Sequence, residues 1–302
     1  MKKPIFTGLC TALVTPFRGG GVDHEMLERL IRRQTEAGVD AIVLAGTTGE
    51  SPTLSLEEKL ELFRRGVAAA EGKCAVIAGT GSNSTAKALE LSRLAAETGV
   101  DGLLVVTPYY NKATQPGLVK HYGAICDAAG LPVIAYNVPS RTGVDISVDT
   151  CRELARMEGI AGIKEASGDI SKAGRILAAC GDDLPLYTGN DDQTVPAMAL
   201  GALGVISVAS NVAPEQMKAL VSAALAGDFQ RAAQCSKNLL PLMDLLFCQV
   251  NPIPVKEAMA MIGLDCGPCR MPLDSLTEEN RQKLRICLDG LGFRDYNRTN
   301  LK

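Results

Sequence analysis

Residues 133–164, VIAYNVPSRTGVDISVDTCRELARMEGIAGIK, contain the unit from which the predicted fold is built. They open with one short apolar run, Val133–Tyr136, and close with another, Ile160–Lys164. Between the two runs lie a loop and a segment of helical length. Strands of a parallel sheet are covered on both faces and therefore appear as nearly continuous apolar runs. The stretch thus predicts a strand, a helix and a second strand parallel to the first.

The same alternation extends over most of the chain. Asp23 and the capping box Ser55–Glu58 each stand where a helix with an apolar face is expected to begin. Eight such units in about 200 residues predict an α/β fold, a closed (β/α)8 TIM barrel. The alternative is an open doubly wound sheet, but no G-x-G-x-x-G follows the first strand. The expected strands are Cys10–Thr15, Ala41–Ala45, Ala75–Ala78, Leu103–Thr107, Val133–Tyr136, Ile160–Lys164, Leu186–Thr188 and Val205–Val208.

Three further helical segments, 214–247, 254–263 and 277–290, follow the eighth strand with no strand between them. We therefore expect a catalytic barrel domain over residues 1–227 and a C-terminal three-helix extension over residues 228–302. The polar end, 294–302, is expected to be frayed.

The composition argues against several functional classes. The 302 residues are 46% apolar and 22% charged, and 31 basic side chains stand against 34 acidic ones, for a net charge of −3. This balance argues against a disordered chain and against nucleic acid as the main partner. The two histidines are His24 and His121, so a zinc site of three histidines cannot form within one chain. We expect no metal.

The cysteines and the N-terminus bear on location and redox chemistry. Ten cysteines lie at irregular spacings, and Pro4 and Gly8 interrupt the apolar run near the start of the chain. We therefore expect no signal peptide, no membrane span and a reduced, cytoplasmic protein. The stretch Cys266-Gly267-Pro268-Cys269 has the letters of a thioredoxin-type redox motif, but Arg270-Met271-Pro272 after it prevents a helix from starting there. We expect a loop with two incidental thiols.

Lys164 is the most informative side chain. Active sites of TIM barrels lie at the C-terminal ends of the strands, and Lys164 ends the sixth expected strand. Alternation places it on the same face as Ile160 and Gly162, toward the barrel interior, and directs Glu165 to the opposite face. One interpretation is a buried ion pair, with Asp191 as the partner. The other is an amine nucleophile, since burial disfavours the ammonium form and an uncharged amine attacks carbonyl groups.

Tyr136 favours the second interpretation. It ends the strand before that of Lys164, and neighbouring strands lie about 4.8 Å apart, so its phenol is expected beside the lysine amine, placed to move protons. The loop Gly46-Thr47-Thr48-Gly49 has no lysine and is therefore not a phosphate-binding P-loop. Its amide groups and its two hydroxyls suit a small carboxylate instead.

Together these residues resemble the dihydrodipicolinate synthases (4-hydroxy-tetrahydrodipicolinate synthases), in the class I Schiff-base aldolase family that also includes N-acetylneuraminate lyase. The resemblance runs from about Thr7 to about Leu291. It rests on five motifs in a fixed order: Gly46–Ser51 (GTTGES), Pro108–Asn111 (PYYN), Tyr136–Gly143 (YNVPSRTG), Gly162–Ala166 (GIKEA) and Asn251–Lys256 (NPIPVK).

The resemblance implies a lyase of the class I aldolase type, acting in the diaminopimelate pathway of lysine biosynthesis. Lys164 would form a Schiff base with pyruvate, and the resulting enamine would attack the aldehyde of L-aspartate-4-semialdehyde. No cofactor is implied beyond this Schiff base. Thr47, Tyr136 and Tyr110 resemble the family's proton relay, in which Tyr110 would come from a neighbouring subunit. The implied assembly is a homo-oligomer, a tetramer made of two dimers.

The remaining substrate contacts are carried over in the same way. Thr48 corresponds to a ligand of the pyruvate carboxylate, and Ile206 and Gly189 to residues at the site. Arg141 corresponds to the residue that receives the carboxylate of the semialdehyde. The alternative is another pyruvate-dependent aldolase, such as an N-acetylneuraminate lyase. Sialic acid lyases lack this arginine, so its presence favours the synthase. A non-catalytic sensor of 2-oxo acids is disfavoured, since a sensor does not need the relay.

The lysine-binding site of feedback-inhibited relatives is matched in part. Ser51, Asn83 and Tyr109 match, but Lys59 and Lys87 stand at the histidine and glutamate positions. Each brings a cation toward a ligand that already carries two ammonium groups, at a cost on the order of 1 kcal/mol or more. We expect a vestigial site and weak or absent inhibition by lysine.

Overall fold

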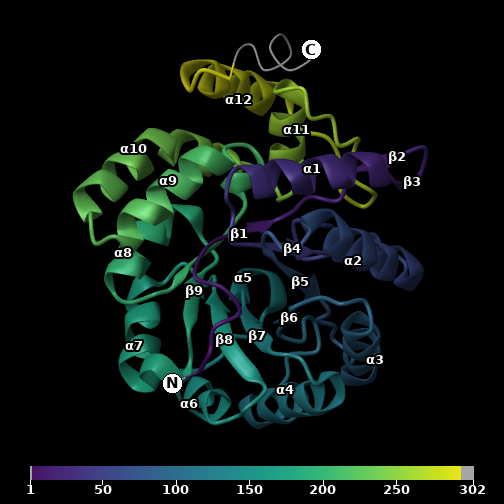
Figure 1. Ribbon diagram of the computed structural model, residues 1–302, viewed down its shortest axis with the longest axis vertical. Coiled ribbons are helices and arrows are strands. Elements are labelled where there is room, and N and C mark those ends of the chain that lie inside the picture. Colours follow the sequence, from purple (N-terminus) through teal and green to yellow (C-terminus); the bar gives the residue numbers. More distant parts are fainter. Residues whose placement is uncertain (1, 294–302) are drawn as a thin grey trace.

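Eight parallel strands close into a barrel in the computed structural model, which describes residues 2–293. The strands neighbour one another in the order β1-β10-β9-β8-β7-β6-β5-β4, and the barrel occupies the centre of Figure 1. The TIM barrel prediction is confirmed. The barrel strands are β1 (Gly8–Ala12), β4 (Ala41–Leu44), β5 (Ala75–Gly79), β6 (Gly102–Val106), β7 (Val133–Asn137), β8 (Ile160–Glu165), β9 (Leu186–Thr188) and β10 (Gly204–Ser207).

Helices surround the barrel (Figure 1). Asp23 accepts a hydrogen bond from the Met26 amide at the start of α1, and Ser55 and Glu58 form the predicted capping box of α2. A short helix, α5 (Pro139–Thr142), lies in the loop after β7, and β2 (Phe17–Arg18) pairs with β3 (Gly21–Val22) in a small hairpin. The surrounding helices are α1 (His24–Glu36), α2 (Leu56–Ala70), α3 (Thr85–Ala96), α4 (Gln115–Ala129), α6 (Val148–Ala155), α7 (Ile170–Cys180), α8 (Thr194–Ala199) and α9 (Pro214–Leu225).

Apolar side chains pack in two layers. The larger cluster lies between the strands and the helices, and the smaller one, which includes Ile77, Leu104 and Ile134, fills the barrel. Phe6 and Tyr187 stack within the inner cluster with ring centroids 4.3 Å apart, and the Tyr187 hydroxyl donates to the Phe6 carbonyl oxygen over 2.6 Å. The interior is therefore a packed core and not a channel, and it supports side chains at the C-terminal ends of the strands from below.

The register of β8 differs from the prediction at one position. Its pairing with β7 shifts between Val133 and Ile134, and Ile160 consequently packs in the outer apolar cluster. The expectation that Ile160 shares a face with Lys164 was wrong, because strict alternation assumes a regular strand and a bulge reverses it. Beyond the shift Tyr136 pairs with Lys164, as the sequence predicts for adjacent strand ends.

The C-terminal extension consists of α10 (Phe229–Leu245), α11 (Ile253–Met261) and α12 (Glu278–Gly290), which confirms three helices after the barrel. The single helix expected over 214–247 was wrong, since α9 and α10 are separate helices that lie side by side (Figure 1). Gly227 has φ +77°, a left-handed conformation that suits glycine, and Asp228 caps α10 by accepting from the Arg231 amide. Residues 294–302, for which fraying was expected, lie outside the described residues.

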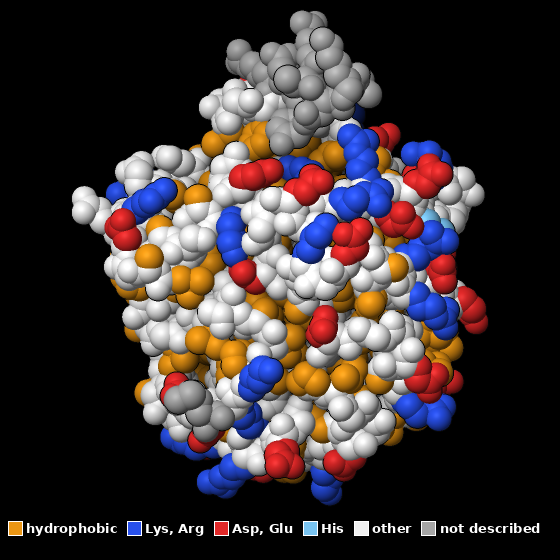
Figure 2. All heavy atoms as spheres, viewed as in Figure 1, with side chains coloured by type: hydrophobic (Ala, Val, Ile, Leu, Met, Phe, Trp, Pro, Cys, Tyr) orange, Lys and Arg blue, Asp and Glu red, His pale blue; other side chains and the backbone are white. Residues whose placement is uncertain are grey.

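Charges of both signs are mixed on the surface. Figure 2 shows lysine and arginine beside aspartate and glutamate over the face in view, without a broad field of one sign. Within residues 2–293, no helix is long and apolar enough to cross a membrane.

Candidate active site

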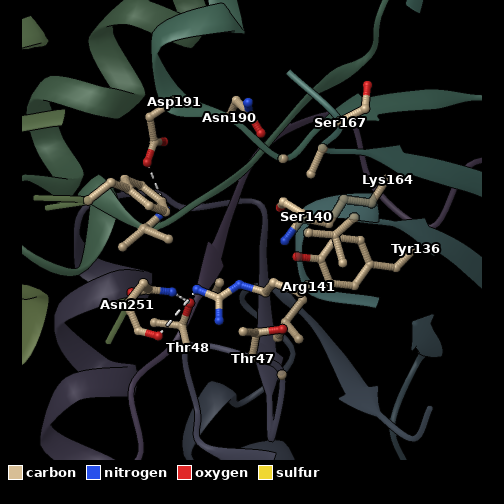
Figure 3. A pocket seen from close by; sticks show the side chains of 18 of the residues that line it. Thr47, Thr48, Tyr136, Ser140, Arg141, Lys164, Ser167, Asn190, Asp191 and Asn251 are labelled. Carbon is tan, nitrogen blue, oxygen red and sulfur yellow. Dashed lines mark hydrogen bonds between the residues drawn. The ribbon is translucent and has the colours of Figure 1, made fainter. Parts of the chain in front are cut away.

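The C-terminal ends of several barrel strands open into one cavity of about 410 Å³ (Figure 3). Six of the residues singled out in the sequence line it: Thr47, Thr48, Tyr136, Arg141, Lys164 and Gly189. They come from the loop after β4, from β7 and α5, from β8 and from the end of β9. Residues widely separated in sequence therefore meet at one place.

Lys164 is buried in the wall of this cavity, with 5% of the residue exposed. Its Nζ lies 4.3 Å from the centre of the Tyr136 ring, and Figure 3 shows the two side chains next to each other. None of the ion pairs within residues 2–293 includes Lys164. The Asp191 carboxylate instead accepts from the amides of Val208 and Ala209 over 3.0 and 2.9 Å, and burial raises its pKa. Lys164 therefore makes no direct ion pair with Asp191 among the described residues, and the two side chains interact electrostatically only over a longer distance.

Glu165 points away from the cavity, as alternation predicts. Its carboxylate accepts from the Asn137 side-chain amide over 2.9 Å and lies 3.5 Å from the ammonium of Lys172. Lys172 also pairs with Asp145. The negative charge next to Lys164 in the sequence is thus neutralised on the outer side of the strand.

Gly189 makes room for the lysine side chain. A Cβ atom at this position would lie 2.7 Å from Cε of Lys164 and 2.6 Å from Cβ of Ala166. Both distances are shorter than van der Waals contact allows, so any larger residue would displace Lys164 or the strand that carries it.

Arg141 and Thr48 are connected through Asn251. The Asn251 side-chain amide donates to the Thr48 hydroxyl over 2.9 Å, and the Arg141 guanidinium donates to the Asn251 carbonyl oxygen over 3.4 Å (Figure 3). Asn251 comes from the segment between α10 and α11, so the C-terminal extension contributes to the cavity wall. Sequence reasoning missed this contribution. The sequence does contain a signal for this contribution, the NPIPVK motif that begins at Asn251, but sequence reasoning gave that motif no role in the site.

The loop after β4 is also held by the extension. Glu50 has a left-handed backbone, φ +55°, and its buried carboxylate lies 2.7 Å from the ammonium of Lys256 in α11. The same carboxylate accepts from the amide of Arg270 over 2.8 Å. These contacts fix the end of the loop that presents Thr47 and Thr48. Glu50, Lys256 and Arg270 were likewise not identified from the sequence.

Two of the expected site residues are not in this cavity. Tyr110 is 88% exposed and has φ +74°. Ile206 is fully buried in the inner apolar cluster, and it is Val208, two residues further on, that lines the cavity.

A second cavity, of about 660 Å³, adjoins the first. Thr47, Tyr136 and Arg141 border both. The second cavity is lined by all five residues of the expected vestigial lysine site: Ser51, Lys59, Asn83, Lys87 and Tyr109.

The segment with Cys266 and Cys269 is a loop between α11 and α12, which confirms the sequence prediction. Burial raises the pKa of Cys266 to about 12 and that of Cys269 to about 11, whereas reactive thiols of redox motifs have lowered values. Across residues 2–293, no group of three or more histidine, cysteine, aspartate or glutamate side chains is arranged to hold a metal ion.

Comparison with known proteins identifies the family. Residues 5–290 match the model of the Dihydrodipicolinate synthetase family. The chain belongs to this family. Curated members of the family include the 4-hydroxy-tetrahydrodipicolinate synthase of Caldicellulosiruptor saccharolyticus, 47% identical over 96% of this chain and 98% of that one. The synthase of Moorella thermoacetica is 48% identical over 94% and 98%.

The barrel agrees with solved structures of the dihydrodipicolinate synthetase family. One is the chloride-inhibited dihydrodipicolinate synthase of Acinetobacter baumannii complexed with pyruvate, with a TM-score of 0.93, 44% identity and coverage of 95% of this chain and 99% of that one. The resemblance inferred from five short motifs therefore extends over nearly the whole chain.

Proposed function

We propose that this protein is a 4-hydroxy-tetrahydrodipicolinate synthase, which condenses pyruvate with L-aspartate-4-semialdehyde. The observation that carries the proposal is the Lys164 amine, buried at the C-terminal end of β8, stacked on Tyr136 and without a carboxylate partner within residues 2–293. An amine in these surroundings is suited to attack a carbonyl group. The family and the names of its members support the same reaction.

The reaction follows from the chemistry of this amine. Lys164 Nζ adds to the ketone carbon of pyruvate, and water leaves to give a protonated imine. This imine withdraws electrons, so the methyl group loses a proton and an enamine forms. The enamine carbon attacks the aldehyde of the semialdehyde, and the amino group of the new chain then displaces Lys164 as the ring closes. Tyr136 and Thr47, both in the cavity wall, transfer the protons.

Arg141 indicates which second substrate the cavity accepts. Its planar guanidinium lines the cavity and is suited to bind a carboxylate with two parallel hydrogen bonds. L-Aspartate-4-semialdehyde carries such a carboxylate, whereas the distal part of a sialic acid is a neutral polyol. The cation therefore favours the synthase over N-acetylneuraminate lyase.

A homo-oligomer completes the site in this proposal. Tyr110 is 88% exposed on a loop near the second cavity, and such exposure suits a side chain that enters the neighbouring subunit's site and joins its proton relay. We place the protein in the cytoplasm as a tetramer of two dimers, with no cofactor beyond the Schiff base. We divide it into a barrel over residues 1–227 and an extension over 228–302.

Reductive trapping tests the proposal. The protein is treated with pyruvate and borohydride, and the modified peptide is located by mass spectrometry. We expect one reduced pyruvyl adduct, on Lys164. The paired lysines Lys172 and Lys256 provide internal controls, because both are also buried, with 7% and 4% of the residue exposed, but are bound to carboxylates. An adduct on another lysine, or none in a folded protein, would refute the proposal.

Turnover then decides between the synthase and its relatives. We expect rapid consumption of pyruvate with L-aspartate-4-semialdehyde and no cleavage of N-acetylneuraminate. The opposite preference would assign the chain to the sialic acid lyases while leaving the Schiff base intact.

Lysine is expected to be a weak inhibitor or none. Lys59 and Lys87 both line the second cavity, and both repel the ammonium groups of the ligand. Steady-state rates measured with increasing lysine check this expectation. Half-inhibition at sub-millimolar lysine would contradict it.

A further inference from the structure

Asp191 is a buried acid in the wall of the catalytic cavity, and the proposed reaction gives it no part. It lies in the loop after β9, only 2% of the residue is exposed, and it lines the cavity together with Lys164 and Arg141. Its Oδ2 atom accepts from the amides of Val208 and Ala209. Its Oδ1 atom has no hydrogen-bond partner among residues 2–293. One half of this carboxylate is therefore held by the backbone, and the other half is unsatisfied.

The unsatisfied oxygen lacks a hydrogen-bond donor. A buried polar atom without a partner is unfavourable, and a buried carboxylate is more so. Burial is the main cause that raises the pKa of Asp191. A cation close to Oδ1 favours the ionised form and supplies the missing hydrogen bond. The other carboxylates in the lining, Asp192 and Asp244, are exposed, so water already serves them.

Of the two proposed substrates, only one can supply such a donor. Pyruvate is an anion without an N–H or O–H group. L-Aspartate-4-semialdehyde carries an ammonium group on the carbon that also bears its carboxylate. The cavity offers a counterpart for each of these charges, Arg141 for the carboxylate and Asp191 for the ammonium group. In Figure 3 Asp191, Arg141 and Lys164 lie at three separate places around the cavity, so the two charged groups and the aldehyde each have a partner of their own.

We propose that Oδ1 of Asp191 binds the ammonium group of L-aspartate-4-semialdehyde, and that this contact makes the enzyme specific for a 4-oxo acid with an amino group at C2. The inference rests on the proposed function and extends it to the second charge of the substrate. A site built to pair a buried polar group rejects ligands that leave it unpaired. An aldehyde without the amino group leaves Oδ1 unsatisfied and is therefore bound more weakly.

Two aldehydes that differ only in the amino group test the proposal. They are L-aspartate-4-semialdehyde and 4-oxobutanoate, whose binding is measured as inhibition of the condensation. In the unmodified protein we expect an inhibition constant for 4-oxobutanoate at least about tenfold above the KM of the semialdehyde. Asp191→Asn keeps an acceptor for the two backbone amides and replaces Oδ1 by an NH2 group. In this variant we expect kcat/KM for the semialdehyde to fall by about 10- to 100-fold, and the inhibition constant of 4-oxobutanoate to change by less than about threefold.

Asp192→Asn is the matched control, because it makes the same change in the next residue, whose side chain is exposed. It is expected to change neither value by more than about threefold. Thermal unfolding establishes that both variants are folded. Since both aldehydes meet the same Lys164, an indirect effect on that amine would shift both values in parallel.

Three results would overturn the proposal: a parallel shift of both values in Asp191→Asn, an equal effect of Asp192→Asn, or equal binding of both aldehydes by the unmodified protein. The last comparison needs no variant and therefore does not depend on the folding of one. Pyruvate is trapped on Lys164 before the aldehyde binds. Failure of trapping consequently refutes the proposed function as well, whereas failure of the aldehyde comparison with trapping intact refutes only the role of Asp191.

Discussion

Lys164 and Lys256 are nearly equally buried, with 5% and 4% of the residue exposed. Each amine also lies 4.3 Å from the centre of an aromatic ring, that of Tyr136 in one case and that of Phe17 in the other. The difference is a carboxylate. Lys256 lies 2.7 Å from Glu50, whereas no ion pair within residues 2–293 includes Lys164.

This difference leads us to propose Lys164 as the reactive lysine and Lys256 as a structural one. A carboxylate offsets the cost of burying an ammonium group and holds the charge in place. An aromatic ring alone binds an amine far less firmly, so the amine of Lys164 lacks the contact that holds Lys256 in place and can reach a substrate in the cavity. Neither burial nor an adjacent ring is therefore sufficient to identify a nucleophile, and the missing partner is the informative feature.

The largest expected effect is on catalysis. Lys164→Ala removes the nucleophile, and we expect kcat/KM for the condensation to fall by about 10³-fold or more. The free energy of unfolding should change little, because no ion pair of the described residues is broken. Steady-state kinetics and chemical denaturation measure the two quantities. A variant with parental activity would refute the assignment of Lys164.

The next effect is on stability. Glu50→Gln keeps an acceptor for the Arg270 amide but leaves Lys256 buried and unpaired, so we expect the free energy of unfolding to fall by about 3–5 kcal/mol. Urea denaturation measures it. The double variant Glu50→Leu/Lys256→Met should recover much of the loss, because both charges are removed together. If the double variant is no more stable than Glu50→Gln, the two side chains are not coupled as described.

A smaller effect is expected from crowding Lys164. Gly189→Ala places a methyl group 2.7 Å from Cε of Lys164, and we expect kcat/KM to fall by about 10- to 100-fold as the amine is displaced. Gly174→Ala is the control, since its added Cβ would meet Leu200 at 3.6 Å, an ordinary contact. Rate constants for borohydride trapping measure the reactivity of the amine directly. Equal rates for both variants would show that Gly189 does not position Lys164.

The smallest effect concerns the network around Lys256. Hydrogen bonds from Arg270 are the main cause that lowers the pKa of Glu58. These hydrogen bonds stabilise the fold fully at pH values above the unfolded-state pKa of about 4.3. The stabilisation is lost as the pH falls through the lower pKa of the folded state. Glu58→Gln should therefore be less stable than the parent by about 0.5–1 kcal/mol at neutral pH. Denaturation across the acidic range should show the difference vanishing, and a pH-independent difference would contradict this explanation.

The barrel was predictable because its strands are buried on both faces. All eight apolar runs overlap observed strands, since burial on both sides leaves a signal that does not depend on the neighbouring elements. The positions of Lys164 and Tyr136 followed from the same reasoning. The division of α9 from α10 did not, because an apolar helical pattern continues across Gly227 and the left-handed turn there shows only in the structure.

The rest of the site depends on contacts that local patterns do not contain. Thr48 and Asn251 are 203 residues apart in sequence, yet they share a hydrogen bond. The shift that moves Ile160 to the outer layer is a property of the β7–β8 pair and not of either strand alone. Sequence reasoning proposed the reactive side chains, which have distinctive chemistry, and missed the residues that hold them.

The attachment of the loop after β4 to Asn251, Lys256 and Arg270 has a consequence for biosynthesis. A ribosome makes the chain from its N-terminus, so all eight strands are complete before these three residues are added. A nascent barrel consequently has its lysine in place while the threonine loop is still untethered. Under the function proposed above, we expect full competence to bind pyruvate only near the end of translation, and we expect a barrel cut off before Asn251 to lack it.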